Sequence, residues 1–290
     1  MIYSTVSKVF SMVQRGTKMG YKLIASDLDG TIFNKIGELS KQNYDAIKTL
    51  YEIGVYFVPT SGRSYGEMPK VLKENPYIRY YIGSDGSTIY DKKTNTTHSL
   101  SLPRELSHFI LDKFFEYPVN MMLHADNDSY VDADRHNVDD YKAHNYSEDW
   151  VNFVFETNKP VGNFKEFAYT KDVESFVTFF KNHNDLLACK DFFGAHPELL
   201  VAQSNKYNLE VFWKNAGKGN AVLKLAEILG IDKSETIAVG DSTNDLTMIK
   251  AAGLGLAMEN AVDELKAVAN KVICSYEQDS AKYILENYIK

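Results

Sequence analysis

Two pairs of aspartates, far apart in the chain, are residues that could hold a metal ion. Asp27 and Asp29 follow a short apolar run, and Asp241 and Asp245 follow another. If these carboxylates converge, their repulsion is severe, because two like charges about 4 Å apart cost roughly 4 kcal/mol at an effective dielectric of about 20. Such a cluster needs a cation, shifted pKa values or both. The candidate ligand atoms are all oxygens, so the cluster predicts a hard ion such as Mg²⁺.

Three other residues are suited to holding a phosphate group near those acids. Ser61 and Gly62 offer a hydroxyl and an unobstructed backbone N–H. Lys218 precedes a predicted helix and could offset the charge of the acids and of an anionic substrate. Blander interpretations remain open for single features. Lys218 taken alone is better explained as a solvated surface lysine, and the Asp27–Asp29 pair alone is equally consistent with an ordinary acidic turn.

The segments that must position these side chains alternate between strands and helices. Apolar runs at residues 23–25, 55–58 and 79–83 predict buried strands, and the stretches between them carry apolar residues at helical spacing. The alternation resumes after residue 213, with a strand predicted over residues 236–239. This pattern predicts an α/β fold built on a parallel sheet. The acids then lie at the carboxyl ends of strands, where ligands of open α/β sheets bind.

Residues 87–213 have a different character, with more aromatic residues, polar turns and alternating strands. Paired strands are predicted near residues 119–131 and a hairpin near residues 199–213. Residues 164–169 predict another strand, and apolar residues at helical spacing over 173–180 predict a helix. The segment is therefore expected to be an inserted α+β module with helices on one face of an antiparallel sheet.

Composition excludes several classes of protein. The chain has 290 residues and a net charge of −7, with no long basic run, so neither a general nucleic-acid partner nor an anionic membrane is expected. Two cysteines without a CxxC motif argue against a disulfide scaffold and favour a reducing, cytoplasmic compartment. No apolar stretch is long enough for a transmembrane helix. Residues 1–18 are basic and lack acids, which indicates an extension or upstream start, with a transit segment as the alternative.

Four segments together resemble the motifs of the haloacid dehalogenase superfamily of phosphohydrolases. They are Asp27-Leu28-Asp29-Gly30-Thr31, Ser61-Gly62-Arg63, Lys218-Gly219 and Gly240-Asp241-Ser242-Thr243-Asn244-Asp245. Their order and the segment at residues 257–261 are most similar to the Cof-type branch, subfamily IIB. The resemblance implies a Rossmann-like core over residues 19–86 and 214–290, with an inserted α+β cap of the C2B type over residues 87–213.

The resemblance also implies a role for each motif residue. Asp27 would attack the phosphoryl group and form an aspartyl-phosphate. Asp29 would protonate the leaving alcohol and then activate water. Lys218 would offset charge in this catalytic set. The residues implied to bind phosphate or substrate are Ser61, Gly62, Arg63 and Asn244. The residues implied to hold Mg²⁺ are Asp27, Asp29 through its main-chain carbonyl, Asp241, and Asp245 through water or an outer contact.

The sequence thus predicts a Mg²⁺-dependent phosphatase acting on small phosphorylated metabolites, with sugar phosphates placed first. One alternative is a phosphosugar mutase or phosphotransferase that uses the same aspartyl-phosphate. A non-catalytic sensor that binds a phosphometabolite is the other, and the intact set of four acids disfavours it. Asp85 stands where the family pattern has asparagine, so it adds a possible negative charge near the cleft and leaves the substrate preference open.

Overall fold

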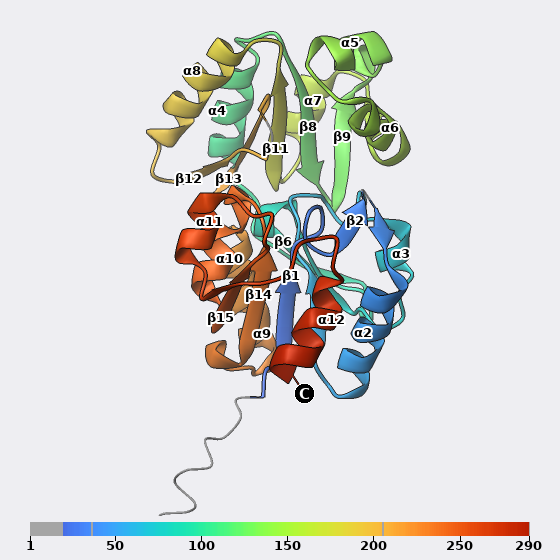
Figure 1. Ribbon diagram of the computed structural model, residues 1–290. Helices are drawn as coiled ribbons and strands as arrows, with labels where there is room; N and C mark the ends of the chain where they lie inside the picture. Colours follow the sequence, from blue (N-terminus) through green and yellow to red (C-terminus); the bar gives the residue numbers. More distant parts are fainter. Residues whose placement is uncertain (1–19, 36, 205, 290) are drawn as a thin grey trace, which may run out of the picture.

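A parallel sheet holds the first apolar run in its interior. The computed structural model describes residues 20–35, 37–204 and 206–289, so the extension predicted at residues 1–18 lies outside the described residues. Within them the sheet has five strands in the order β16-β15-β14-β1-β4, and all neighbouring pairs are parallel (Figure 1). The strands are β1 (Leu23–Ser26), β4 (Tyr56–Pro59), β14 (Thr236–Gly240), β15 (Leu254–Ala257) and β16 (Lys271–Val272). The predicted parallel α/β core is confirmed.

The register between β1 and β14 explains how distant acids meet. Ser26, the last residue of β1, is the partner of Val239 in β14. Both strands are fully buried, as expected for apolar strands covered on two faces. Because the strands are parallel and in register, Asp27 and Asp241 leave the sheet at the same edge.

Helices cover the two faces of this sheet (Figure 1). Ser40 begins α2 as its N-cap, since its hydroxyl accepts a hydrogen bond from the N–H of Asn43 at 3.0 Å. Gly230 ends α9 in the left-handed region with a φ of 66°. The helices are α2 (Lys41–Glu52), α3 (Lys70–Lys73), α9 (Lys218–Leu229), α10 (Leu246–Ala251), α11 (Asp263–Val268) and α12 (Ser280–Ile284), which continues into a π-helical segment, Leu285–Ile289.

A second, antiparallel sheet extends the core beyond β4. It consists of β5 (Tyr80–Gly83), β6 (Thr88–Asp91) and β7 (Thr96–Ser99), and a bridge between Thr60 and Ile82 joins it to the parallel sheet. Ile89 of β6 packs in the same apolar cluster as β1. The sequence predicted that the inserted module begins at residue 87. We propose instead that the module starts near Leu102, which packs in the second apolar cluster. The remaining short strands of the core are β2 (Phe33–Lys35) and β3 (Glu38–Leu39).

The inserted module, called the cap below, is built on a six-stranded sheet in the order β10-β9-β8-β11-β13-β12 within the described residues. It lies over the carboxyl ends of β1 and β14 (Figure 1). Its strands are β8 (Val119–Ala125), β9 (Asp128–Asp132), β10 (Lys159–Val161), β11 (Ser175–Phe180), β12 (Leu199–Ala202) and β13 (Asn208–Trp213). Its helices are α4 (Arg104–Phe114), α5 (Val138–Ala143), α6 (Glu148–Thr157), α7 (Phe164–Tyr169) and α8 (His183–Gly194).

Two elements of the cap differ from the sequence-based expectation. Residues 164–169 form helix α7 instead of a strand, because Phe164 and Ala168 lie one helical turn apart and both face the cap core. Residues 175–180 form strand β11 instead of a helix. All six of its side chains are buried between two strand neighbours, so the apolar spacing of this segment reflects burial on both faces and carries no helical period.

The cap sheet is covered on both faces, whereas the sequence predicted helices on one face only. Leu123 and Phe176 face the cluster that contains residues of α4 and α8. Met122 and Val177, their neighbours in sequence, point to the opposite face and pack with residues of α5 and α6. Met122 and Val177 on this second face also line a cavity between cap and core. No helix in the described ranges has both the length and the apolar character that crossing a membrane requires.

Candidate active site

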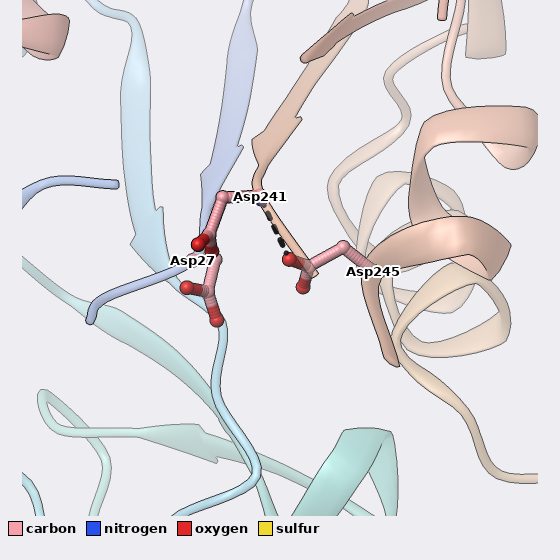
Figure 2. A group of neighbouring side chains, drawn as sticks. All are labelled: Asp27, Asp241 and Asp245. Atoms are coloured by element: carbon pink, nitrogen blue, oxygen red, sulfur yellow. Dashed lines mark hydrogen bonds between the residues drawn. The ribbon is translucent and has the colours of Figure 1, made fainter. Parts of the chain in front are cut away.

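Three aspartates meet at the edge of the parallel sheet. Asp27 follows β1, Asp241 follows β14, and Asp245 ends the 3₁₀ turn Thr243–Asp245. One carboxylate oxygen of each lies within 4.8 Å of the others (Figure 2). The carboxylate of Asp245 accepts hydrogen bonds from the N–H groups of Asp241, at 3.0 Å, and Ser242, at 3.1 Å. The loop backbone therefore holds Asp245 in place beside the other two acids.

Lys218 is the cation that lies among these acids. Its Nζ is 2.8 Å from Oδ1 of Asp27 and 2.6 Å from Oδ1 of Asp245, and only 1% of the residue is exposed. Lys218 is the first residue of α9, directly after Gly217 with a φ of 92°. Burial alone would lower the pKa of Lys218, but the carboxylates of Asp245 and Asp27 outweigh burial and raise it. The side chain therefore stays charged.

The acids remain crowded even with Lys218 present. Burial, followed by the carboxylate of Asp245, raises the pKa of Asp27 well above its usual value and that of Asp241 to about 7. Gly30 keeps the space beside Asp241 open, because a Cβ at this position would lie 2.5 Å from Oδ2 of Asp241. An all-oxygen donor set with this excess of negative charge fits a hard divalent cation.

The carboxylate of Asp29 points elsewhere. Arg63 donates two hydrogen bonds to its Oδ2, from Nε at 3.1 Å and from Nη2 at 2.7 Å. The side chain of Asp29 is 40% exposed and is not part of the three-acid group found among the described residues. The guanidinium of Arg63 also lies 4.3 Å from the ring centre of Phe153 in the cap. Arg63 thus orients Asp29 and contacts the cap. The contact with phosphate or substrate predicted for Arg63 from the sequence stays a prediction.

The other predicted phosphate-binding residues lie on two neighbouring loops. Ser61 follows β4, and its Oγ accepts a hydrogen bond from the N–H of Arg63 at 3.2 Å. A Cβ on Gly62 would lie 3.2 Å from the carboxylate of Asp85. Asn244 donates to Oδ1 of Asp85 at 3.4 Å. Burial, followed by the neighbouring carboxyl group of Glu210 in the cap, raises the pKa of Asp85 to about 8.

Core and cap enclose one cavity of about 250 Å³ around these residues. Its core side includes predicted site residues, namely Asp27, Asp29, Ser61, Gly62, Arg63, Asp241 and Asn244. Its cap side includes residues that the sequence did not single out, namely Met122, His124, Trp150, Phe153, Val177, Ser204, Asn208 and Glu210. The cap residues come from β8, β11, β13 and α6 and from the loop before β13. No common spacing in the sequence could have marked them as one wall.

A buried ion pair joins core and cap at the margin of this cavity. Oε2 of Glu67 lies 3.0 Å from Nε2 of His124, and each side chain is 2% exposed. Oε1 of Glu67 accepts a hydrogen bond from Asn158 of the cap at 2.7 Å. Burial alone would raise the pKa of Glu67, but His124 and the hydrogen bonds outweigh it and lower the pKa to about 2. The same pairing raises the pKa of His124 against the effect of burial.

Comparison with known proteins identifies the family of this chain. The pattern described as haloacid dehalogenase-like hydrolase matches residues 24–285. A 5-amino-6-(5-phospho-D-ribitylamino)uracil phosphatase from Bacillus subtilis, YwtE, is 27% identical over 285 residues, which covers 92% of this chain and 98% of the relative.

Solved structures share the whole architecture, core and cap together. A haloacid dehalogenase-like hydrolase from B. subtilis is similar with a TM-score of 0.75 at 23% identity, over 92% of this chain and 99% of that one. A subclass IIB sugar phosphatase is similar with a TM-score of 0.77 at 18% identity, over 92% and 98%. Because the family pattern spans the sheet, the cap and all four motifs, the chain belongs to the haloacid dehalogenase-like hydrolases, in the Cof-type branch that its sequence predicted.

Proposed function

We infer that this phosphatase hydrolyses phosphomonoesters of small metabolites with the help of Mg²⁺ and through an aspartyl-phosphate on Asp27. The observation that carries the proposal is the convergence of Asp27, Asp241 and Asp245 to within 4.8 Å, with Lys218 paired to two of them. The same cavity holds Asp29, the candidate acid. The proposal therefore rests on a nucleophile, a cation site and a proton donor that lie in one enclosed place.

The proposed reaction has two steps, formation of the aspartyl-phosphate and its hydrolysis. In the first, a carboxylate oxygen of Asp27 bonds to phosphorus while the bond from phosphorus to the ester oxygen breaks, and Asp29 gives that oxygen its proton. In the second, water attacks the same phosphorus, Asp29 accepts a proton from the water, and phosphate leaves Asp27. Lys218 holds Oδ1 of Asp27 at 2.8 Å, which favours Oδ2 as the attacking atom.

Arg63 prepares Asp29 for this role. It occupies Oδ2 of Asp29 with two hydrogen bonds, whereas Oδ1 is buried and has no hydrogen-bond partner within the described residues. Oδ1 is therefore the atom to carry the proton. A planar, two-pronged donor fixes the direction of a carboxylate better than a single contact does, which suits a group that must reach one ester oxygen.

Charge balance supports an anionic substrate. With Asp29 matched by Arg63, the three clustered carboxylates are matched by Lys218 and one divalent cation. Bound there by Asp27, Asp241 and, less directly, Asp245, Mg²⁺ would neutralise developing charge on the phosphoryl oxygens. Ser61 and the N–H of Gly62 would then donate hydrogen bonds to the remaining phosphate oxygens. The cytoplasmic location predicted from the sequence stays a prediction.

Relatives support the reaction more strongly than the substrate class. YwtE is named for a phosphorylated ribitylaminouracil, whereas one of the solved structures is named a sugar phosphatase. Sugar phosphates, which the sequence placed first, and phosphate esters of other small metabolites both fall within the proposed class.

Release of inorganic phosphate from a panel of phosphomonoesters, with Mg²⁺ and with a chelator, tests this proposal. We expect release that needs Mg²⁺ and that is lost in Asp27→Asn, while Asp139→Asn, a change at the exposed surface of the cap, has no effect. Undiminished turnover by Asp27→Asn would overturn the assignment of the nucleophile. Transfer of phosphate to added glycerol in preference to water would favour the phosphotransferase alternative, and binding of esters without turnover would favour the sensor.

A further inference from the structure

One aromatic residue of the cap lies against the arginine that holds the candidate acid. Phe153 is in α6, and the guanidinium carbon of Arg63 lies over its ring, 4.3 Å from the ring centre. The face of an aromatic ring attracts a cation, and the attraction grows where water is excluded. Water is largely excluded here, because the side chain of Arg63 is only 8% exposed. The contact therefore restrains a side chain of the core from the cap.

Phe153 is itself fixed to the body of the cap. Ser147 begins α6 as its N-cap and accepts a hydrogen bond from the N–H of Trp150 at 3.3 Å. The ring of Trp150 meets that of Phe153 edge to face, with their centres 5.0 Å apart and their planes at 84°. The ring centre of Trp150 also lies 6.1 Å from that of Phe179 in β11. The ring beside Arg63 is thus tied to the cap sheet.

The carboxylate of Asp29 depends on Arg63 for its direction. Its side chain is 40% exposed, so packing alone does not fix it. The two hydrogen bonds from Arg63 to Oδ2 fix it instead, and they leave Oδ1, which has no partner within the described residues, to carry the proton. When that proton moves to the ester oxygen, the guanidinium stabilises the carboxylate that remains. An arginine side chain has many rotamers, so a contact that holds the guanidinium also holds the acid.

We propose that Phe153 is a positioning residue for the acid Asp29 and acts through Arg63. With the ring in place, the guanidinium keeps both of its donors on Asp29. Without the ring, the guanidinium can turn away, and Asp29 loses its direction. Proton donation then depends on the position of the cap, because the core supplies the acid and the cap supplies the ring. The inference rests on the proposed phosphatase reaction and adds a residue of the cap to it.

The proton from Asp29 matters more for some esters than for others. Breaking the bond from phosphorus to the ester oxygen leaves negative charge on that oxygen. A strongly acidic phenol carries this charge without a proton, whereas a weakly acidic phenol needs one. Attack by Asp27 is common to both kinds of ester. The ratio kcat/KM reports on the reaction up to departure of the phenol, so hydrolysis of the aspartyl-phosphate does not enter it.

Three phenyl phosphates of similar shape separate the effect of the acid from the effect of binding. They are 4-nitrophenyl, 4-chlorophenyl and 4-methylphenyl phosphate, in order of falling acidity of the phenol. In Phe153→Leu we expect kcat/KM to fall at least about tenfold for 4-methylphenyl phosphate but less than about threefold for 4-nitrophenyl phosphate, because a well-placed acid contributes about 100-fold or more. The loss for 4-chlorophenyl phosphate should lie between these two. The spread of kcat/KM among the three esters therefore increases.

Three further changes test whether Phe153 acts through Arg63. Phe153→Tyr keeps a ring beside the guanidinium and should restore the wild-type spread. Phe155→Leu, a matched change on the same helix but outside the cavity lining, should also keep the wild-type spread. Arg63→Met should increase the spread at least as much as Phe153→Leu does, and adding Phe153→Leu to it should increase the spread no further. Each spread is measured on one protein preparation, so a partly unfolded fraction cancels.

The outcomes distinguish this inference from the proposed function. If the wild-type enzyme hydrolyses none of the three esters with Mg²⁺ present, the phosphatase proposal fails and the inference fails with it. If the wild type hydrolyses them and Phe153→Leu slows all three by the same factor, or slows none, the reaction stands and the inference is overturned. A spread that increases further when Phe153→Leu is added to Arg63→Met would show that the ring acts by another route, which also overturns the inference.

Discussion

Glu67 of the core and His124 of the cap form a buried ion pair, with 3.0 Å between Oε2 of the acid and Nε2 of the ring. Glu67 also accepts hydrogen bonds from the N–H and the hydroxyl of Ser64, which lies in the loop beside the predicted phosphate-binding residues. The pair thus ties the position of the cap sheet to a loop of the active site. Changes at His124 are therefore expected to act on both stability and cap placement.

Replacing His124 should strongly destabilise the protein. In His124→Gln the carboxylate of Glu67 stays buried without a charged partner, and removal of one member of a buried pair typically costs about 3–5 kcal/mol. The midpoint of urea unfolding measures this loss. His98→Gln changes an exposed histidine on β7 and should leave the midpoint unchanged. Equal midpoints for the two variants would show that the buried pair does not stabilise the fold.

The same pair predicts how stability depends on pH. The pKa of His124 is raised, so its contribution is complete below its unfolded value of about 6.5 and is lost as pH rises through the folded value. The pKa of Glu67 is lowered to about 2, so its contribution is present above about 4.5 and is lost toward pH 2. Melting temperatures between pH 6 and 9 should fall more for the wild type than for His124→Gln. Parallel curves would contradict the assignment.

Removing the charge of Lys218 should damage catalysis. Lys218→Met keeps most of the side-chain volume but leaves Asp27 and Asp245 to repel each other, and it removes a cation from the transferring phosphoryl group. We expect kcat to fall by at least about 100-fold, the usual effect of losing one preorganised electrostatic contact. Lys224→Met, a surface change on the same helix α9, is the control. Steady-state phosphate release measures both, and comparable rates for the two variants would contradict the role of Lys218.

Adding one methyl group at Gly30 should weaken binding of Mg²⁺. Gly30 has a φ of 81°, and a Cβ there would lie 2.5 Å from Oδ2 of Asp241. Gly54 has nearly the same φ, 80°, but a Cβ there meets nothing within 4 Å. Both Gly→Ala changes should cost about 1 kcal/mol of stability through backbone strain. Only Gly30→Ala should lower the affinity for Mg²⁺, by at least about tenfold, in isothermal titration calorimetry.

Protons should compete with Mg²⁺ for the acid cluster. Because the pKa of Asp241 is raised to about 7, this carboxyl carries a proton at pH 6 and must lose it when the cation binds. Calorimetry should therefore show weaker Mg²⁺ binding at pH 6 than at pH 8, with proton release that depends on the buffer. Saturation at 100 times the dissociation constant should stabilise the fold by about 2.7 kcal/mol, and Asp241→Asn should abolish most of this gain. Binding that is equally tight at both pH values would contradict this account.

The sequence by itself determined the parallel core and the edge of the sheet at which its acids lie. Apolar runs followed by Asp27 and Asp241 predict strand exits, and parallel strands in one sheet end at the same edge. Local patterns therefore place both acids at one edge of the sheet, whereas their contact depends on β1 and β14 being neighbouring strands. Lys218, at the beginning of α9, is also marked by its position before an apolar helical stripe.

Only the tertiary structure decided which segments of the cap are strands or helices and which side chains the charged groups pair with. Strand β11 is buried on both faces, so its apolar residues carry no period that separates strand from helix. The hairpin of β6 and β7 alternates like the strands of the cap, yet its hydrogen bonds join it to β5 and the core. The pairing of Arg63 with Asp29 and the common wall of Trp150 and Glu210 depend on how distant segments pack. No spacing along the chain encodes such contacts, because they form only when separate sheets and helices are brought face to face.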